Sequence, residues 1–218
     1  MKLRTPLLAL AALTTAVLSS AASANVIVGV SLDTSSLEGM AGSPFVLDLQ
    51  LNDGSGTNDA NNTAVVTQLS FGTGSAVGSP TVGGGAAVSA GTITLSDSSF
   101  LNSFDQAFQP GSELSFDLTL TTNVDAGPTP DEFSMSLFDA AGNMIPTSGL
   151  LSAFLVVDID SSAPQIQTFA GIGDFAAIGA PIVGPTAPPT GSAPEPGTVA
   201  LLGLAGIGLL RARRKRRD

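Results

Sequence analysis

The side chains that could do chemistry in this sequence are almost all carboxylates and hydroxyls. The chain contains no His, Cys, Trp or Tyr, and its eight basic residues all lie before residue 5 or after residue 210. A Ser or Thr nucleophile would therefore lack a His or Lys base, and phosphoryl transfer would lack a cationic clamp. No phosphate-binding glycine pattern follows a strand. We expect a protein that is not an enzyme.

Paired carboxylates can hydrolyse glycosidic bonds, so a glycoside hydrolase is the enzyme class that these residue types leave open. Asp158 and Asp160 share one face of a predicted strand. Sugar sites usually also stack rings on aromatic side chains, and Phe is the one aromatic type present. We interpret Asp158 and Asp160 as surface acids and keep the hydrolase as a remote alternative.

Oxygen-bearing side chains crowd one predicted loop, which is the kind of ligand that calcium prefers. They are Asn52, Asp53, Asn58, Asp59, Asn61 and Asn62, with a second oxygen-rich stretch at 158–162. Neither stretch has EF-hand spacing. We predict no catalytic residue, no metal ligand and no cofactor, with a structural calcium ion as the alternative.

The charges are divided between the middle and the ends of the chain. All but two of the 18 acidic residues lie between residues 25 and 193, a segment that we call the body and that has no Lys or Arg. Such a body repels nucleic acid, whose binding depends on Lys and Arg, and it repels anionic polysaccharide and lipid. We predict no nucleic-acid partner, and the basic ends have a separate role.

The N-terminal segment 1–24 has the layout of a secretory signal peptide. Lys2 and Arg4 precede an apolar stretch, and small residues follow it. Ala22 and Ala24 are suited to signal peptidase, which would leave Asn25 as the first mature residue.

The C-terminal segment 194–218 combines three features in order. The tripeptide Pro194, Glu195 and Pro196 is followed by an apolar run at 197–210, and the basic tail at 211–217 contains Arg211, Arg213, Arg214, Lys215, Arg216 and Arg217. As a transmembrane helix the run would be about 21 Å long, so it spans a core of about 30 Å only with bilayer thinning and snorkelling. The basic tail would stay in the cytoplasm and the body outside.

This arrangement resembles the PEP-CTERM sorting signal of exported proteins in Gram-negative bacteria, often ones that make exopolysaccharide. The resemblance implies recognition and processing by an exosortase, after transient anchoring in the inner membrane, and release to the cell surface or the extracellular matrix. Stretches 32–56, 61–66 and 99–111 also resemble one group of PEP-CTERM proteins. That second resemblance implies no established activity.

The body has the alternation of half-buried antiparallel strands. We predict strands at 26–32, 45–51, 65–71, 92–95, 113–122, 132–139, 153–160 and 165–169. Phe100, Phe104 and Phe108 recur every fourth residue and predict a short helix within 97–111. Glycine-rich and Asn-rich stretches between the strands are predicted turns. The fold class is all-β: an antiparallel β-sandwich, jelly-roll or immunoglobulin-like, at 25–175, followed by a Pro/Gly/Ala linker at 176–193.

These observations favour a non-catalytic exported protein with a structural or adhesive role in an extracellular polysaccharide matrix or the cell envelope. The alternative is a recognition module that binds a glycan or calcium. The expected processing partners are signal peptidase and an exosortase, and an extracellular polysaccharide is the expected ligand.

Overall fold

The computed structural model describes residues 25–55, 58–124, 127–159 and 163–186. Their compact unit ends at Pro185, and we call it the two-sheet body. The predicted signal peptide, the predicted transmembrane helix 197–210 and the basic tail lie outside the described residues. Among the residues that are described, no helix is long and apolar enough to cross a membrane.

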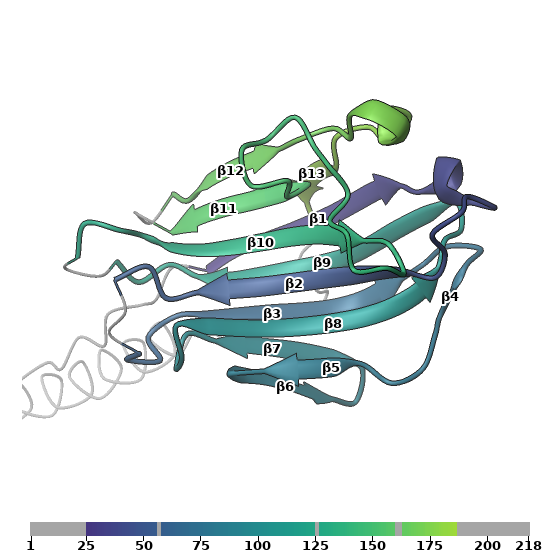
Figure 1. The fold of residues 1–218 in the computed structure, drawn as a ribbon. Coiled ribbons are helices and arrows are strands. Elements are labelled where there is room, and N and C mark those ends of the chain that lie inside the picture. The colour runs from purple at the N-terminus through teal and green to yellow at the C-terminus, as the bar shows by residue number, and fades with distance from the viewer. Residues whose placement is uncertain (1–24, 56–57, 125–126, 160–162, 187–218) are drawn as a thin grey trace, which may run out of the picture. The chain divides into compact units, whose positions relative to one another are not determined.

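Two antiparallel sheets make up the fold (Figure 1). Sheet A has the order β13 (Ile182–Pro185), β1 (Asn25–Asp33), β9 (Glu113–Thr121), β3 (Thr63–Ser70), β7 (Thr92–Ser96) and β6 (Gly85–Ser89). Sheet B has the order β12 (Gln165–Thr168), β11 (Leu155–Ile159), β10 (Asp131–Phe138), β2 (Phe45–Asn52), β8 (Leu101–Gln109) and β4 (Ser75–Ala76), with β5 (Thr81–Gly83) also on β8. Two 3-10 turns, η1 (Ser35–Leu37) and η2 (Gly173–Phe175), complete the described elements.

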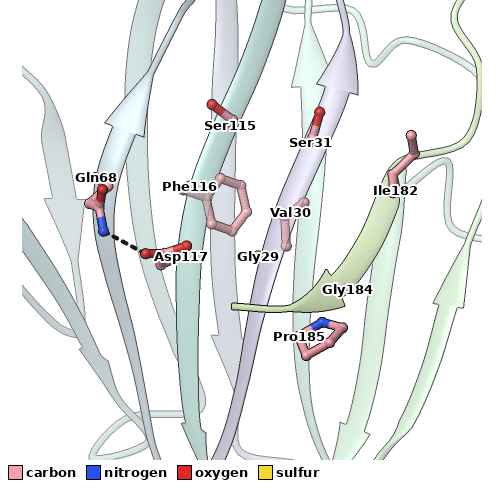
Figure 2. A pocket seen from close by; sticks show the side chains of 10 residues that line it. All are labelled: Gly29, Val30, Ser31, Gln68, Ser115, Phe116, Asp117, Ile182, Gly184 and Pro185. Atoms are coloured by element: carbon pink, nitrogen blue, oxygen red, sulfur yellow. Dashed lines mark hydrogen bonds between the residues drawn. The ribbon is translucent and has the colours of Figure 1, made fainter. Parts of the chain in front are cut away.

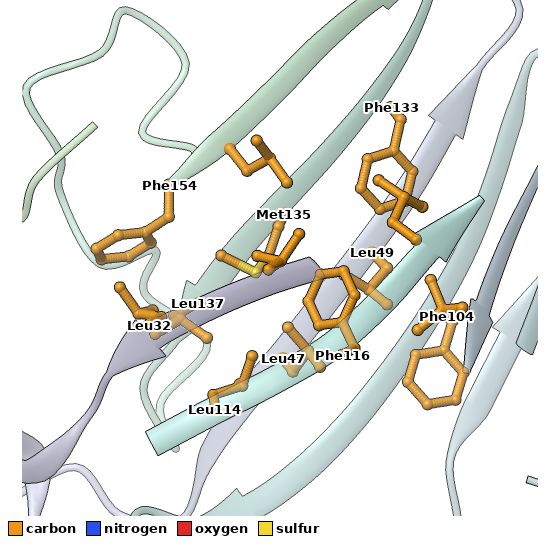
Figure 3. Packing of buried hydrophobic residues seen from close by; sticks show 14 of the residues in the cluster. Leu32, Leu47, Leu49, Phe104, Leu114, Phe116, Phe133, Met135, Leu137 and Phe154 are labelled. Carbon is orange, nitrogen blue, oxygen red and sulfur yellow. The ribbon is translucent and has the colours of Figure 1, made fainter. Parts of the chain in front are cut away.

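The alternating strands bury one face each, as predicted. Leu114 and Phe116 of β9, in sheet A, join the same hydrophobic cluster as Leu47 and Leu49 of β2, in sheet B. Figure 3 shows these side chains gathered between the strands. Each fully buried side chain of this size contributes about 1.5–3 kcal/mol relative to an exposed one. The cluster therefore holds the two sheets face to face.

The segment 97–111 is not a helix. It contains strand β8, which pairs along its length with β2. Phe104 and Phe108 do share one buried face, but a spacing of four residues fits two repeats of a strand as well as one turn of a helix. Asn102 and Gln106 lie on that same face, where their buried amides donate to backbone carbonyls at 2.9 and 3.1 Å. Because these two inward residues are polar, the sequence did not show the alternation. Phe100, before the strand, is exposed.

The alternation predicted for 65–71 holds only in its second half. In β3 the buried residues are Ala64 and Val66, whereas Thr67 faces outward. The pairing with β9 shifts register after Thr67. This bulge moves the inward positions by one residue, so Phe71 becomes buried.

The two-sheet body is longer than predicted, because residues 176–185 do not form a linker. Ile178 is fully buried, and β13 pairs with β1 at the edge of sheet A. The predicted turn region 72–86 also holds β4, β5 and the start of β6. These strands are short and rich in Gly, Ala and Pro. Hydrogen-bonded pairing with a neighbouring strand, rather than an alternating sequence pattern, defines them.

Candidate functional site

The residues predicted to direct sorting lie mostly outside the described part of the chain. Ala22, Ala24, the tripeptide Pro194 to Pro196 and the basic residues from Arg211 are not described, whereas Asn25 is the exposed first residue of β1. The structure therefore describes the exported body, which has two outer sheet faces and a polar interior.

The outer face of sheet B is polar across most of its width. The register places the outward side chains in three rows, Asp158–Glu132–Asn52, Gln167–Val156–Ser134–Gln50–Ser103 and Ser136–Asp48–Asp105–Thr81. The residues between these positions in β2, β10 and β11 belong to the hydrophobic cluster. This surface, which we call the sheet B outer face, therefore carries carboxylates, amides and hydroxyls together, although neighbouring groups cover Asp48, Ser134 and Ser136 almost completely.

Two carboxylates stand opposite each other in the middle of this face. Asp48 of β2 pairs with Asp105 of β8, and Asp48 is only 3% exposed because its neighbours in the wide sheet cover it. Its Oδ2 accepts a hydrogen bond from Gln50 Nε2 at 2.7 Å, while its Oδ1 has no partner. Burial raises the pKa of Asp48 to about 6, and the charge of Asp105 adds to that rise. A like-charged pair in register is destabilising.

A second carboxylate pair lies in a pocket on the same face. Glu132 of β10 pairs with Asp158 of β11, and a hollow of about 420 Å³ opens above them. Gln167 Nε2 donates to Asp158 Oδ2 at 3.3 Å. Burial raises the pKa of Glu132, and the Asp158 carboxylate raises it further. The predicted partner of Asp158, Asp160, lies outside the described residues.

The outer face of sheet A carries a shallower hollow of about 340 Å³ (Figure 2). It forms where Gly29 of β1 lies opposite Gly184 of β13, since neither residue has a side chain to fill the surface. Its carboxylate, Asp117, already accepts a hydrogen bond from Gln68 Nε2 at 2.6 Å. Ile182 borders the hollow. This hollow therefore offers a ligand fewer polar side chains for hydrogen bonding than the sheet B outer face does.

Asn62 is the centre of a buried polar network at one end of the two-sheet body. Its Nδ2 donates to Asp131 Oδ2 at 2.7 Å and to the Asn123 carbonyl at 2.8 Å. Its Oδ1 accepts from the Asn123 N–H at 2.9 Å and from Thr121 Oγ1 at 3.1 Å. Asp97 Oδ2 accepts the Asn62 backbone N–H at 2.9 Å. The network thus joins the β2–β3, β7–β8 and β9–β10 connections.

The oxygen-rich loop at 52–62, for which calcium binding was the alternative, uses its oxygens largely within the protein. Asp53 is buried and its Oδ2 accepts the Asn58 backbone N–H, and Asn62 is the buried hub. Asn58 and Asp59 are exposed. In the described ranges, no three His, Cys, Asp or Glu side chains are grouped so that they could hold a metal ion.

Asp97 and Asp131 form a buried acid pair beside Asn62. Asp97 Oδ1 receives no hydrogen bond in the described structure. Burial raises the pKa of Asp97 to about 7, and the nearby carboxyl groups of Asp131 and Asp59 add to the rise. Burial and the neighbouring carboxyl groups therefore favour the protonated form of Asp97.

The raised pKa of Asp97 predicts how the folding stability depends on pH. Because the folded pKa of Asp97, about 7, exceeds the unfolded value of about 3.9, its stabilising contribution is complete below about pH 4 and is lost as the pH rises through about 7. We expect Asp97→Asn, which mimics the protonated acid, to reduce the loss of stability between pH 5 and pH 8 by about 1 kcal/mol or more. Urea unfolding at both pH values measures this difference.

The control is Asp33→Asn, because Asp33 is exposed and hydrogen bonds from Ser35 lower its pKa. That variant should lose as much stability as the unsubstituted protein over the same pH range. An Asp97→Asn variant with the unchanged pH slope would show that Asp97 is already ionised at pH 5.

Comparison with known proteins identifies one feature of this chain. Residues 192–217 match the PEP-CTERM protein-sorting motif. No curated protein and no solved structure matches the chain. The match covers the tripeptide, the apolar run and the basic tail that the sequence analysis singled out. The chain is therefore an exported protein with a sorting signal for processing by an exosortase.

Proposed function

We propose that this protein is a non-catalytic exported module that attaches to extracellular polysaccharide through the sheet B outer face. The observation that carries the proposal is the set of three in-register rows of carboxylates, amides and hydroxyls on that face. These groups donate and accept the hydrogen bonds that sugar hydroxyls require. Rows of this kind can follow an extended chain across several strands.

The fold is suited to such a role. We infer that the two-sheet body is a β-sandwich of the jelly-roll kind, because the chain passes from one sheet to the other at most connections between β1 and β10. Its strands are rigid supports, and a polar face on rigid strands loses little entropy when it binds a ligand. After exosortase processing the body would remain at the cell surface or in the matrix.

A binding role explains the residue types better than catalysis does. The body lacks His, Cys, Lys, Arg and Tyr, so acid–base work would fall to carboxylates. Glu132 and Asp158 project side by side from one sheet surface, whereas the two carboxylates of a glycosidase flank the bond that they cleave. We therefore propose that the pocket binds sugar without hydrolysing it.

A glycan array with the purified exported protein tests this proposal, with and without calcium. We expect binding to extended polysaccharides that calcium does not change, and no release of reducing ends from the bound polymers. The variant Ser134→Leu, on the sheet B outer face, should weaken binding, whereas Thr94→Leu on sheet A should not. Absence of binding to every glycan would refute the proposed function, and release of reducing ends would show a hydrolase instead.

A further inference from the structure

The pocket above Glu132 and Asp158 combines an acidic floor with an apolar wall. Besides the two carboxylates it is lined by Leu150, Leu151 and Phe169. Leu150 and Leu151 are among the most exposed large hydrophobic residues described, at 103% and 60%. The volume of about 420 Å³ falls in the range of small-molecule sites, roughly 300–1,000 Å³.

The wall of the pocket is fixed by contacts within the fold. The Ser148 backbone N–H donates to the Ala170 carbonyl at 2.9 Å, and Thr147 Oγ1 donates to the Ala153 carbonyl at 3.0 Å. A Cβ added to Gly149 would lie 2.8 Å from the Phe169 ring, so the absent side chain lets this ring pack against the loop. The pocket is therefore formed before any ligand arrives.

The acidic floor has no basic residue of the exported body to neutralise it. Glu132 and Asp158 are directly opposite each other in register, and no Lys, Arg or His exists anywhere between residues 25 and 193. Two neighbouring carboxylates repel each other, and partial burial reduces the screening by water. A bound cationic group would remove this repulsion.

We propose that this pocket binds an amine-bearing sugar unit, so that the polysaccharide recognised by the protein is cationic. The inference rests on the proposed function and names the class of its glycan. An ammonium group would lie between Glu132 and Asp158, where its hydrogen bonds are charge-assisted. The C–H face of the sugar ring would pack on Phe169 and the two leucines, and its hydroxyls would reach Gln167.

Other ligand classes satisfy fewer of these features. A neutral sugar would leave the repulsion between the two carboxylates in place. An anionic polymer would add to it, and the body is acidic throughout. A lysine side chain supplies the ammonium group but no ring face and no hydroxyls for Gln167. A sugar with a free amine matches the floor, the wall and the amide together.

Two oligosaccharides that share one backbone test this inference. We would titrate the exported protein with a glucosamine hexamer and with its fully N-acetylated counterpart, which differ in charge at each sugar unit. We expect the glucosamine hexamer to bind at least about tenfold more tightly. Glu132→Gln and Asp158→Asn should each remove most of that preference, whereas Asp117→Asn, on the opposite sheet, should keep it.

Equal binding of the two hexamers, or binding that neither pocket variant weakens, would overturn this inference while the proposed polysaccharide role stands. Binding of hexalysine as tight as that of the glucosamine hexamer would overturn it in favour of a basic peptide. If neither hexamer nor any other glycan binds, the proposed function fails as well.

Discussion

Replacing Pro194, Glu195 and Pro196 with alanine should leave the C-terminal segment on the exported chain. The tripeptide lies within the matched sorting motif at 192–217. Proline disfavours a regular helix, so we expect the tripeptide to offer a processing enzyme an extended peptide. Alanines there would remove both proline restraints and the carboxylate of Glu195. Processing should therefore stop rather than slow.

Intact mass measured on the exported protein checks this result. The unsubstituted chain should end near residues 194–197, whereas the triple-alanine variant should keep the arginine tail and stay in the membrane fraction. The matched control replaces Pro188 and Pro189, which lie outside the motif, and it should be processed normally. Release of the triple-alanine variant with the same mass as the unsubstituted protein would show that the tripeptide is not recognised.

Asn62→Ala should cause a large loss of folding stability. The substitution removes the hydrogen bonds that the Asn62 side chain makes with the Asn123 N–H, the Asn123 carbonyl and one oxygen of Asp131. Asn62 is fully buried, and each buried polar group that loses its partner costs about 1–3 kcal/mol. We expect a loss of about 3–5 kcal/mol, because these costs are not fully additive.

Thermal and urea unfolding of the exported protein measure this loss, and a decrease of about 10 °C in Tm corresponds to it for a domain of this size. The neighbouring variant Asn61→Ala is the control, because the Asn61 side chain donates to Asp59 at the surface. That variant should lose less than about 1 kcal/mol. If the two variants are equally stable, the Asn62 network does not hold the three connections together.

Much of the fold could be predicted because alternation is a local property of the sequence. The run from Leu114 to Leu120 alternates without interruption, and β9 has the predicted buried face. Prediction went wrong where polar residues were buried, as at Asn102 in β8, and where pairing alone defines a strand, as in β13. Whether a buried amide finds a carbonyl depends on strands distant in sequence, so local patterns could not reveal it.

The candidate site was harder to predict from the sequence than the fold was. Sequence spacing drew attention to Asp158 and Asp160, which are two residues apart, whereas the partner that the structure gives Asp158 is Glu132 on another strand. Likewise, Asp48 and Asp105 become neighbours only through the pairing of β2 with β8. The positions of acidic residues along the chain do not reveal which of them pair across neighbouring strands.

The sequence by itself determined where this protein is sent and what chemistry its body lacks, because a sorting signal is read as a continuous segment and composition needs no fold. The tertiary structure alone decided which carboxylates meet. Strand register, set by the packing of the two sheets around one apolar cluster, brings Glu132 to Asp158 and Asn62 to Asp131 across long stretches of chain.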